Sequence, residues 1–235
     1  MVLLIPVARC GPSFSRLICY WSKTMKKQLA GWGLAAGVLV AAGHAQAQTA
    51  EIKVTGRIVP DACQFTIGNG GVYDFGSIGS DKLNQDAVTT LDAKTQTVAI
   101  SCNAAAKVAL NVRDNRSGTA AGGKGDDYEF GLGGKDKFTG YYTLALTRAV
   151  GDGSTLDVLA APAGSDAWAL DSTGSMANGQ ARKSFSDSGS VAPGAYKSIT
   201  ANLTVTPTIN KLSALDLSNG GVDLDGSATV ELTYL

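Results

Sequence analysis

Short runs in which apolar and polar residues alternate are the feature that most restricts how this chain can fold. The last run covers residues 228–234 and ends next to Leu235. Its small or apolar members are Ala228, Val230, Leu232 and Tyr234. A period of two over seven residues is typical of a β-strand with one buried face. Because a terminal strand frays unless it is held in a sheet, its pairing partners become the central question.

Five further runs show the same alternation. They cover residues 52–59, 96–102, 107–114, 141–147 and 198–208. Shorter candidates lie at 72–76 and 128–132, and nothing has the spacing of a long amphipathic helix. Many short strands separated by glycine-rich turns predict an all-β sandwich or barrel.

The first 47 residues differ from the rest of the chain. Residues 25–47 begin with Met-Lys-Lys, continue with an apolar run from Leu29 to Gly43, and end in Ala45-Gln46-Ala47. This order is typical of a secretory signal peptide, and the apolar run is shorter than the roughly 18 residues of a membrane-spanning helix. We expect export with cleavage after Ala47; an uncleaved anchor is the alternative. Residues 1–24 are interpreted as an over-called upstream segment.

The exported part would comprise residues 48–235, one β-sandwich domain with a loop-rich insertion at about 114–195. Of the 20 basic and 20 acidic residues of the chain, five basic ones and no acidic ones precede residue 48. The exported part therefore has 15 basic and 20 acidic residues. A mildly acidic chain without a basic cluster is not expected to bind nucleic acid.

The single histidine, His44, lies in the predicted signal peptide. Its removal excludes Ser-His-Asp and Cys-His catalysis and histidine metal sites, so we expect no enzyme, no catalytic or metal-binding residues and no cofactor. The acidic clusters at 126–129 and 223–225 suit calcium chemically but match no complete calcium-loop motif, and are interpreted as solvated turns. Trp168 is interpreted as a packing residue, with a sugar-stacking platform as the alternative.

Two cysteines remain after cleavage, Cys63 and Cys102. In an oxidising compartment an even pair predicts one disulfide. Closing a loop of about 40 residues would stabilise the fold by about 4 kcal/mol in the chain-entropy model. A free pair and a two-cysteine metal site are the alternatives.

Several segments, taken in order, resemble one known family. The chain reads VTGRIVPDACQF, then GGVYDFGSI, then TVAISCN, and finishes on an alternating strand with Tyr234 as its penultimate residue. This series resembles the pilin superfamily of chaperone–usher fimbriae. Together with FGLG at 130–133, GYYTLAL and LDGSATVELTYL, it most closely resembles a proteobacterial group of pilin-like exported proteins, catalogued as a domain of unknown function and described as fimbrial-like.

The resemblance implies an immunoglobulin-like sandwich that lacks its last strand. In such a subunit a periplasmic chaperone lends a strand, which the N-terminal extension of the next subunit later replaces, a form of β-strand addition. The implied pairing edge is Ala228, Val230, Leu232 and Tyr234, with the Leu235 carboxylate as the anchor for the chaperone. The implied partners are that chaperone, an outer-membrane usher, other pilin subunits and a host or surface receptor. The implied route is through the periplasm to the cell surface.

The N-terminus departs from this pattern. A donor segment needs roughly ten unpaired residues, but eight residues lie between Ala47 and Gly56, and residues 52–54 are expected to begin the first core strand. Three explanations are open. The protein is a terminal subunit that accepts a strand and donates none, or a monomeric binding protein that fills its own edge with part of residues 114–195, or it is cleaved before Ala47. We favour the accepting subunit.

Overall fold

The computed structural model describes residues 53–55, 62–133 and 138–235. The chain separates into two units, Met1–Thr55 and Gly56–Leu235, and the fold below is that of the second. No helix in the described ranges combines the length and hydrophobicity needed to cross a membrane. The predicted signal peptide and upstream segment lie outside the described residues.

The second unit is an all-β sandwich, as predicted, and every strand pair in it is antiparallel. One layer contains β1 (Gln64–Ile67), β3 (Lys94–Ala106), β10 (Tyr196–Ile209) and β6 (Gly140–Gly151). The other contains β7 (Ser154–Pro162), β9 (Ala181–Asp187), β4 (Val108–Asp114) and β11 (Ala228–Tyr234). Short strands extend these layers: β2 (Thr89–Thr90), β5 (Phe130–Gly131) and β8 (Ala169–Leu170). Three short 3₁₀ helices complete the described elements: η1 (Gly68–Gly71), η2 (Ser80–Lys82) and η3 (Leu212–Ala214).

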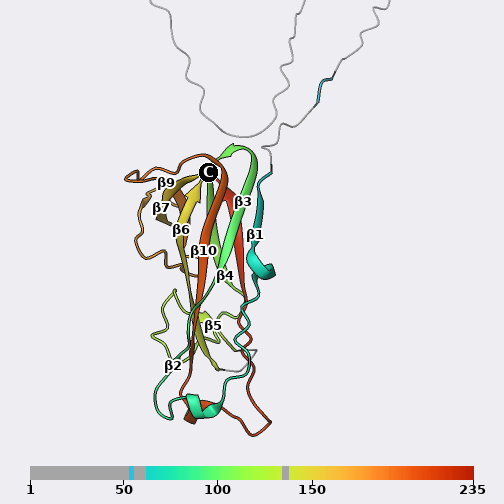
Figure 1. Ribbon diagram of the computed structural model, residues 1–235, viewed down its shortest axis with the longest axis vertical. Helices are drawn as coiled ribbons and strands as arrows, with labels where there is room; N and C mark the ends of the chain where they lie inside the picture. The colour runs from blue at the N-terminus through green and yellow to red at the C-terminus, as the bar shows by residue number, and fades with distance from the viewer. Residues whose placement is uncertain (1–52, 56–61, 134–137) are drawn as a thin grey trace, which may run out of the picture. The chain divides into compact units, whose positions relative to one another are not determined.

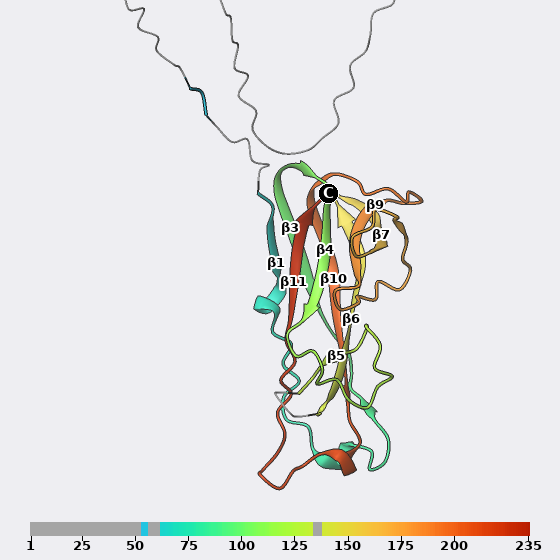
Figure 2. The same ribbon diagram turned by 180° about the vertical axis from the view of Figure 1, so that it is seen from behind.

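The strand order is β1-β3-β10-β6-β7-β9-β4-β11, so β1 and β11 are its two ends. The two layers are joined by the β6–β7 hairpin, which pairs over only two residues on each strand. Figure 1 shows β10 and β3 in front of β4, and Figure 2 shows β4 and β11 from the opposite side. The core lies between the layers because alternate residues of each strand point inward.

The core strands confirm most of the alternating patterns. In β4 the inward residues Val108, Leu110 and Val112 are at most 1% exposed. Of the run at 52–59, the structure describes residues 53–55. These residues lie in no strand and are exposed, so the prediction that they begin a core strand is wrong. The rest of that run lies outside the described residues, and the first described strand, β1, begins at Gln64.

The region 114–195 is less loop-like than expected. It contains β6, β7 and β9, and residues 170–190 include the buried Met176 and Ala177. Backbone hydrogen bonds join Met176 N–H to Leu144 O and Gly179 N–H to Val112 O. Residues 174–179 therefore bridge β6 of one layer and β4 of the other, and close the side of the sandwich between these two strands.

One ion pair is enclosed in this region. Lys183 of β9 donates to the carboxylate of Asp171, and the two side chains are 4% and 12% exposed. Burial alone would raise the pKa of Asp171, but the hydrogen bonds from Lys183 and Thr173 hold it below its usual range. Polar residues at buried positions of β9 explain why sequence periodicity did not reveal this strand.

The predicted disulfide is confirmed. Cys63, one residue before β1, is bonded to Cys102 of β3, with the two Cα atoms 4.0 Å apart. The bond fixes the start of β1 to the layer that β3 belongs to.

Candidate functional site

The two end strands of the sheet order, β1 and β11, lie next to each other on one side of the sandwich (Figure 2). They are not paired: in the described part of the chain, β1 pairs with β3 and β11 pairs with β4. At one end, the N–H of Cys63 donates to the side-chain hydroxyl of Tyr234 over 2.6 Å. At this end the tyrosine side chain reaches across the interval between the two strands. We call this interval the open edge.

The backbone groups of β11 point alternately toward β4 and toward the open edge. Leu235 N–H bonds to Lys107 O, and Asn115 N–H bonds to Ser227 O. Residues 227 and 235 therefore point their backbone groups toward β4, and so do the odd-numbered residues between them, because hydrogen-bonded pairs alternate in an antiparallel ladder. The backbone N–H and C=O groups that point to the open edge belong to Ala228, Val230, Leu232 and Tyr234.

The same alternation of backbone direction applies to β1. The Cys63 N–H points toward β11, since it binds Tyr234. Alternation along the strand places the backbone groups of Phe65 and Ile67 on that side as well. The two strands thus face each other across the open edge with unpaired peptide groups.

The side chains at the open edge are only partly covered. Val230 and Leu232 are half-buried, whereas their cross-strand partners in β4, Val112 and Leu110, are 0% and 1% exposed. Phe65 and Ile67 of β1 also pack against the core and are half-buried. The core is therefore sealed along β4 and incompletely covered where β11 and β1 approach each other.

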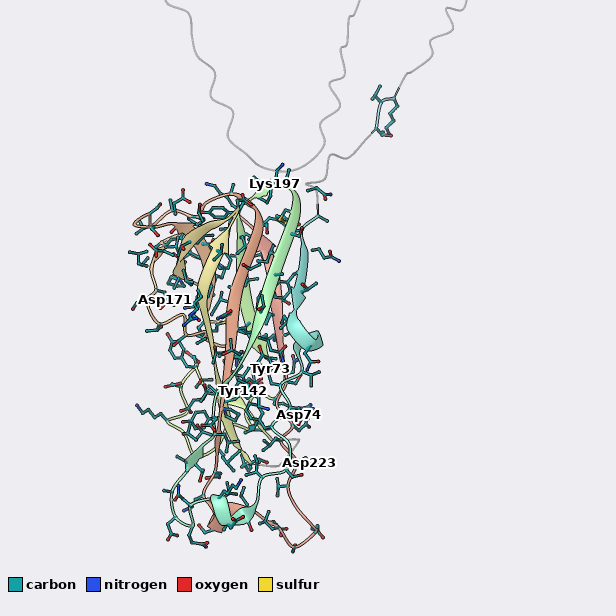
Figure 3. The ribbon with its side chains drawn as sticks, viewed as in Figure 1. Tyr73, Asp74, Tyr142, Asp171, Lys197 and Asp223 are labelled. Carbon is teal, nitrogen blue, oxygen red and sulfur yellow. A yellow bond between two sulfur atoms is a disulfide. The ribbon has the colours of Figure 1, made fainter. Side chains whose placement is uncertain are left out.

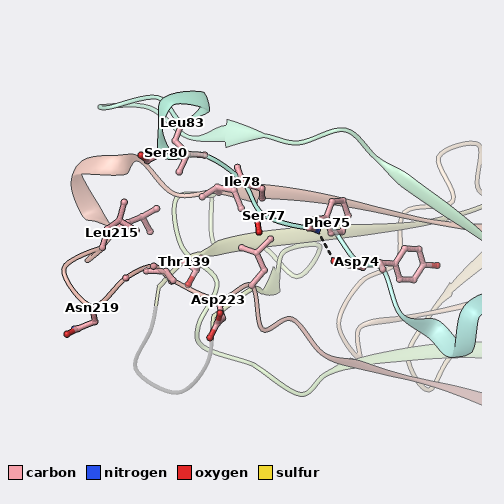
Figure 4. A pocket seen from close by; sticks show the side chains of 18 of the residues that line it. Asp74, Phe75, Ser77, Ile78, Ser80, Leu83, Thr139, Leu215, Asn219 and Asp223 are labelled. Carbon is pink, nitrogen blue, oxygen red and sulfur yellow. Dashed lines mark hydrogen bonds between the residues drawn. The ribbon is translucent and has the colours of Figure 1, made fainter.

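Beyond the ends of both strands the open edge leads to a cavity of about 1180 Å³. One wall is residues 72–83, which follow β1, and the other is residues 215–224, which precede β11 (Figure 4). We call this cavity the chamber. The sequence did not reveal it, because its walls come from segments outside the regular strands and more than 130 residues apart.

Two tyrosines fix the chamber walls to the core. Tyr73 donates its hydroxyl to Leu203 O over 2.9 Å, and burial raises the pKa of Tyr73 to about 12. Across from it, Gly226 lies directly against the ring of Tyr142, since a Cβ at residue 226 would be 2.8 Å from Tyr142 Cε1. Figure 3 labels both tyrosines on the ribbon. A larger residue at 226 would push the segment before β11 outward.

A second, smaller cavity of about 490 Å³ lies at the other end of β11, where Leu235 and Tyr234 line it together with Trp168. The ring of Trp168 is 5.1 Å from the Arg182 guanidinium carbon, and Arg182 pairs with Asp166 at 3.0 Å. Trp168 is half-buried. Packing against Arg182 accounts for its position.

The acidic clusters have turn and ion-pair roles. Glu129 accepts the N–H groups of Lys124 and Gly125, and Asp225 pairs with Arg116 at 2.6 Å. In the described ranges, no three His, Cys, Asp or Glu side chains are grouped as a metal site would require.

Comparison with known proteins finds similarity to one family of unknown function and to two proteins of Escherichia coli. Residues 52–163 match the family described as "Protein of unknown function (DUF1120)". The chain is 29% identical over 220 residues to the uncharacterized protein YhcF of Escherichia coli K12, covering 79% of this chain and 89% of YhcF. It is 25% identical over 252 residues to protein GltF of the same strain, covering 89% of this chain and 99% of GltF. The chain is thus similar to DUF1120 proteins across β1, β3, β4 and β6, and to YhcF and GltF over most of its length.

Proposed function

We propose that the protein is a fimbrial-type structural or adhesive subunit that is exported to the periplasm and cell surface. A β-strand donated by a chaperone or by a neighbouring subunit completes its sandwich. The observation that carries this proposal is the open edge, where half-buried apolar side chains and unpaired peptide groups occur on the same residues of β11.

The physical reason is that an unpaired strand edge next to exposed apolar side chains readily pairs with another chain and promotes aggregation. Soluble proteins usually blunt such edges with charges, prolines or bulges. The residues of β11 that face the core carry no charge, and β11 has a continuous register with β4 from Ala228 to Tyr234. An inserted strand would pair with β11 and β1 simultaneously and would cover Val230 and Leu232.

The open edge also sets the length of the donor. From Val222, in the chamber wall, to Tyr234 there are 13 residues, which span about 40 Å at roughly 3.3 Å per residue. A donor of about 12 residues fits this span. The peptide of residues 48–60, which is 13 residues long, has this length and serves below as a test donor.

The self-completed monomer is the competing function. Its filling segment was expected within 114–195. Residues 174–179 of that region bridge β6 and β4, and Arg116 and Leu132 contact Asp225 before β11, but in the described part of the chain β4 is the only strand that pairs with β11. This favours completion by another polypeptide.

Hydrogen exchange followed residue by residue in the exported chain tests the proposal. In the free protein the amides of Val230, Leu232 and Tyr234 should exchange quickly, while those of Thr229, Glu231 and Thr233 are protected by β4. Addition of a synthetic peptide of residues 48–60 should slow the first set by at least about tenfold and leave the second set unchanged.

Uniform protection of β11 without any peptide would show that its edge is already covered, and would refute the proposal. In cells, material sheared from the surface should form ladders that resist SDS. Recovery of a monomer alone, with a protected β11 edge, would support the self-completed binding protein instead.

A further inference from the structure

We propose that the chamber receives a lysine or arginine side chain from the donated strand. This inference rests on the proposed function and adds the chemistry of the partner, which nothing in the strand pairing itself specifies. Three features of the chamber carry it: its walls, one buried hydroxyl and its charges.

Part of the chamber wall is apolar and incompletely covered. Phe75, Ile78 and Leu83 on one side face Leu215 and Leu224 on the other, and all five side chains are half-buried (Figure 4). A cavity of about 1180 Å³ is much larger than one methylene chain, so it accommodates a long side chain together with the backbone that carries it. The apolar part of the wall favours a side chain with an aliphatic stem.

One buried polar group in the chamber is unsatisfied. Thr139 lines the chamber and is 1% exposed, and its Oγ1 has no hydrogen-bond partner among the described residues. A buried hydroxyl without a partner is unfavourable. An occupant that donates a hydrogen bond here would remove this penalty.

The charges of the chamber have one sign. Its ionisable side chains other than tyrosine are Asp74 and Asp223, and its lining includes no lysine or arginine. Asp74 Oδ1 accepts the N–H of Gly76 over 2.8 Å, and Asp223 takes part in no hydrogen bond or ion pair in the described ranges. Lys94 is nearby: its ammonium contacts the backbone oxygen of Asp74 and the ring of Phe75, and in the described ranges it forms no ion pair with the carboxylate of Asp74 or Asp223.

Lysine and arginine combine the properties that these features require. Each has an aliphatic stem that packs on apolar surface while its charged head remains polar. Each head only donates hydrogen bonds, which suits the free acceptor of Thr139 and the carboxylates of Asp74 and Asp223. A glutamate would meet like charges, and norleucine would leave Thr139 unsatisfied.

Peptide binding to the exported chain tests the inference. The probes are fluorescein-labelled peptides of residues 48–60 with lysine, norleucine or glutamate at peptide position Ala50 or Pro60, so that both directions of insertion are covered. Fluorescence anisotropy at low salt should show that lysine binds about tenfold more tightly than norleucine at one of these ends, and that glutamate binds most weakly. The preference for lysine should shrink at high salt.

Variants identify the groups responsible. Asp74→Asn with Asp223→Asn should reduce the preference for lysine to about twofold or less, because asparagine keeps the Gly76 contact but removes the charge. Asp127→Asn is the matched control, since Asp127 is exposed and outside the chamber. Thr139→Val should raise the urea midpoint of the free protein and still weaken binding of the lysine peptide relative to norleucine.

The outcomes separate the two proposals. If no peptide binds, the open edge does not accept strands, and both the proposed function and this inference fail. If all peptides bind equally, or if the preference for lysine survives the double asparagine variant, the strand-accepting function stands and the lysine-binding chamber is wrong.

Discussion

Truncation of two leucines that face each other across β4 and β11 provides a quantitative test of the open edge. Leu110 and Leu232 are cross-strand partners with the same side chain, but Leu110 is 1% exposed and Leu232 is half-buried. A Leu→Ala change in a sealed core costs about 2–5 kcal/mol, because a cavity remains. Leu110→Ala should lower the free energy of unfolding by that amount.

Leu232→Ala should cost much less in the free protein. Full burial of a leucine contributes about 1.5–3 kcal/mol, and a side chain that already contacts water contributes roughly half of this, about 1 kcal/mol. With the donor bound, Leu232 becomes covered, and its truncation should then cost about as much as that of Leu110. The difference appears as weaker donor binding, by about tenfold or more.

Urea unfolding of the exported chain, followed by far-UV circular dichroism with and without the peptide of residues 48–60, measures both costs. Val112→Ala and Val230→Ala repeat the comparison one pair further along the same two strands. Equal costs for Leu110→Ala and Leu232→Ala in the free protein would refute the reasoning, because they would mean that the β11 side of the core is already sealed.

Two further predictions concern the stability of the sandwich. Asp171→Asn should destabilise the protein by about 3–5 kcal/mol because it leaves Lys183 buried without its partner, whereas Lys183→Met combined with Asp171→Leu should be close to neutral in urea unfolding. Since the pKa of Asp171 is lowered in the folded state, its contribution to the free energy of unfolding should be complete at neutral pH and should decline as pH falls below about 5 toward that folded pKa. The free energy of unfolding of the wild type should therefore fall more steeply in this range than that of the double variant. Equal declines in the two proteins would contradict this. Removal of the disulfide by Cys63→Ala with Cys102→Ala, which opens a loop with a sequence separation of 39, should cost about 4 kcal/mol. It should also speed hydrogen exchange in β1 before it affects β10, and simultaneous loss of protection in both strands would contradict the local role of the bond.

The sequence was sufficient to predict features that depend on the residue pattern alone. Period-two alternation predicted β4, β10 and β11 because each of these strands has one face toward a single apolar core. The two cysteines that follow the predicted signal peptide predicted one bond, because only one pairing exists between them. Local pattern failed for β9, where Lys183 is buried through its ion pair with Asp171, and for residues 53–55, whose alternation does not correspond to a strand.

Tertiary structure alone decided where the fold is incomplete. Alternation shows that β11 has a buried face, but not which edge of β11 is paired, because both edges of a strand carry identical peptide groups. The chamber depends on Asp74, Thr139 and Asp223, which are far apart in the chain and are brought together only when β1 and β11 end the sheet order side by side. The sequence thus determined the strands and their disulfide, while the packing of the two layers determined the open edge between them.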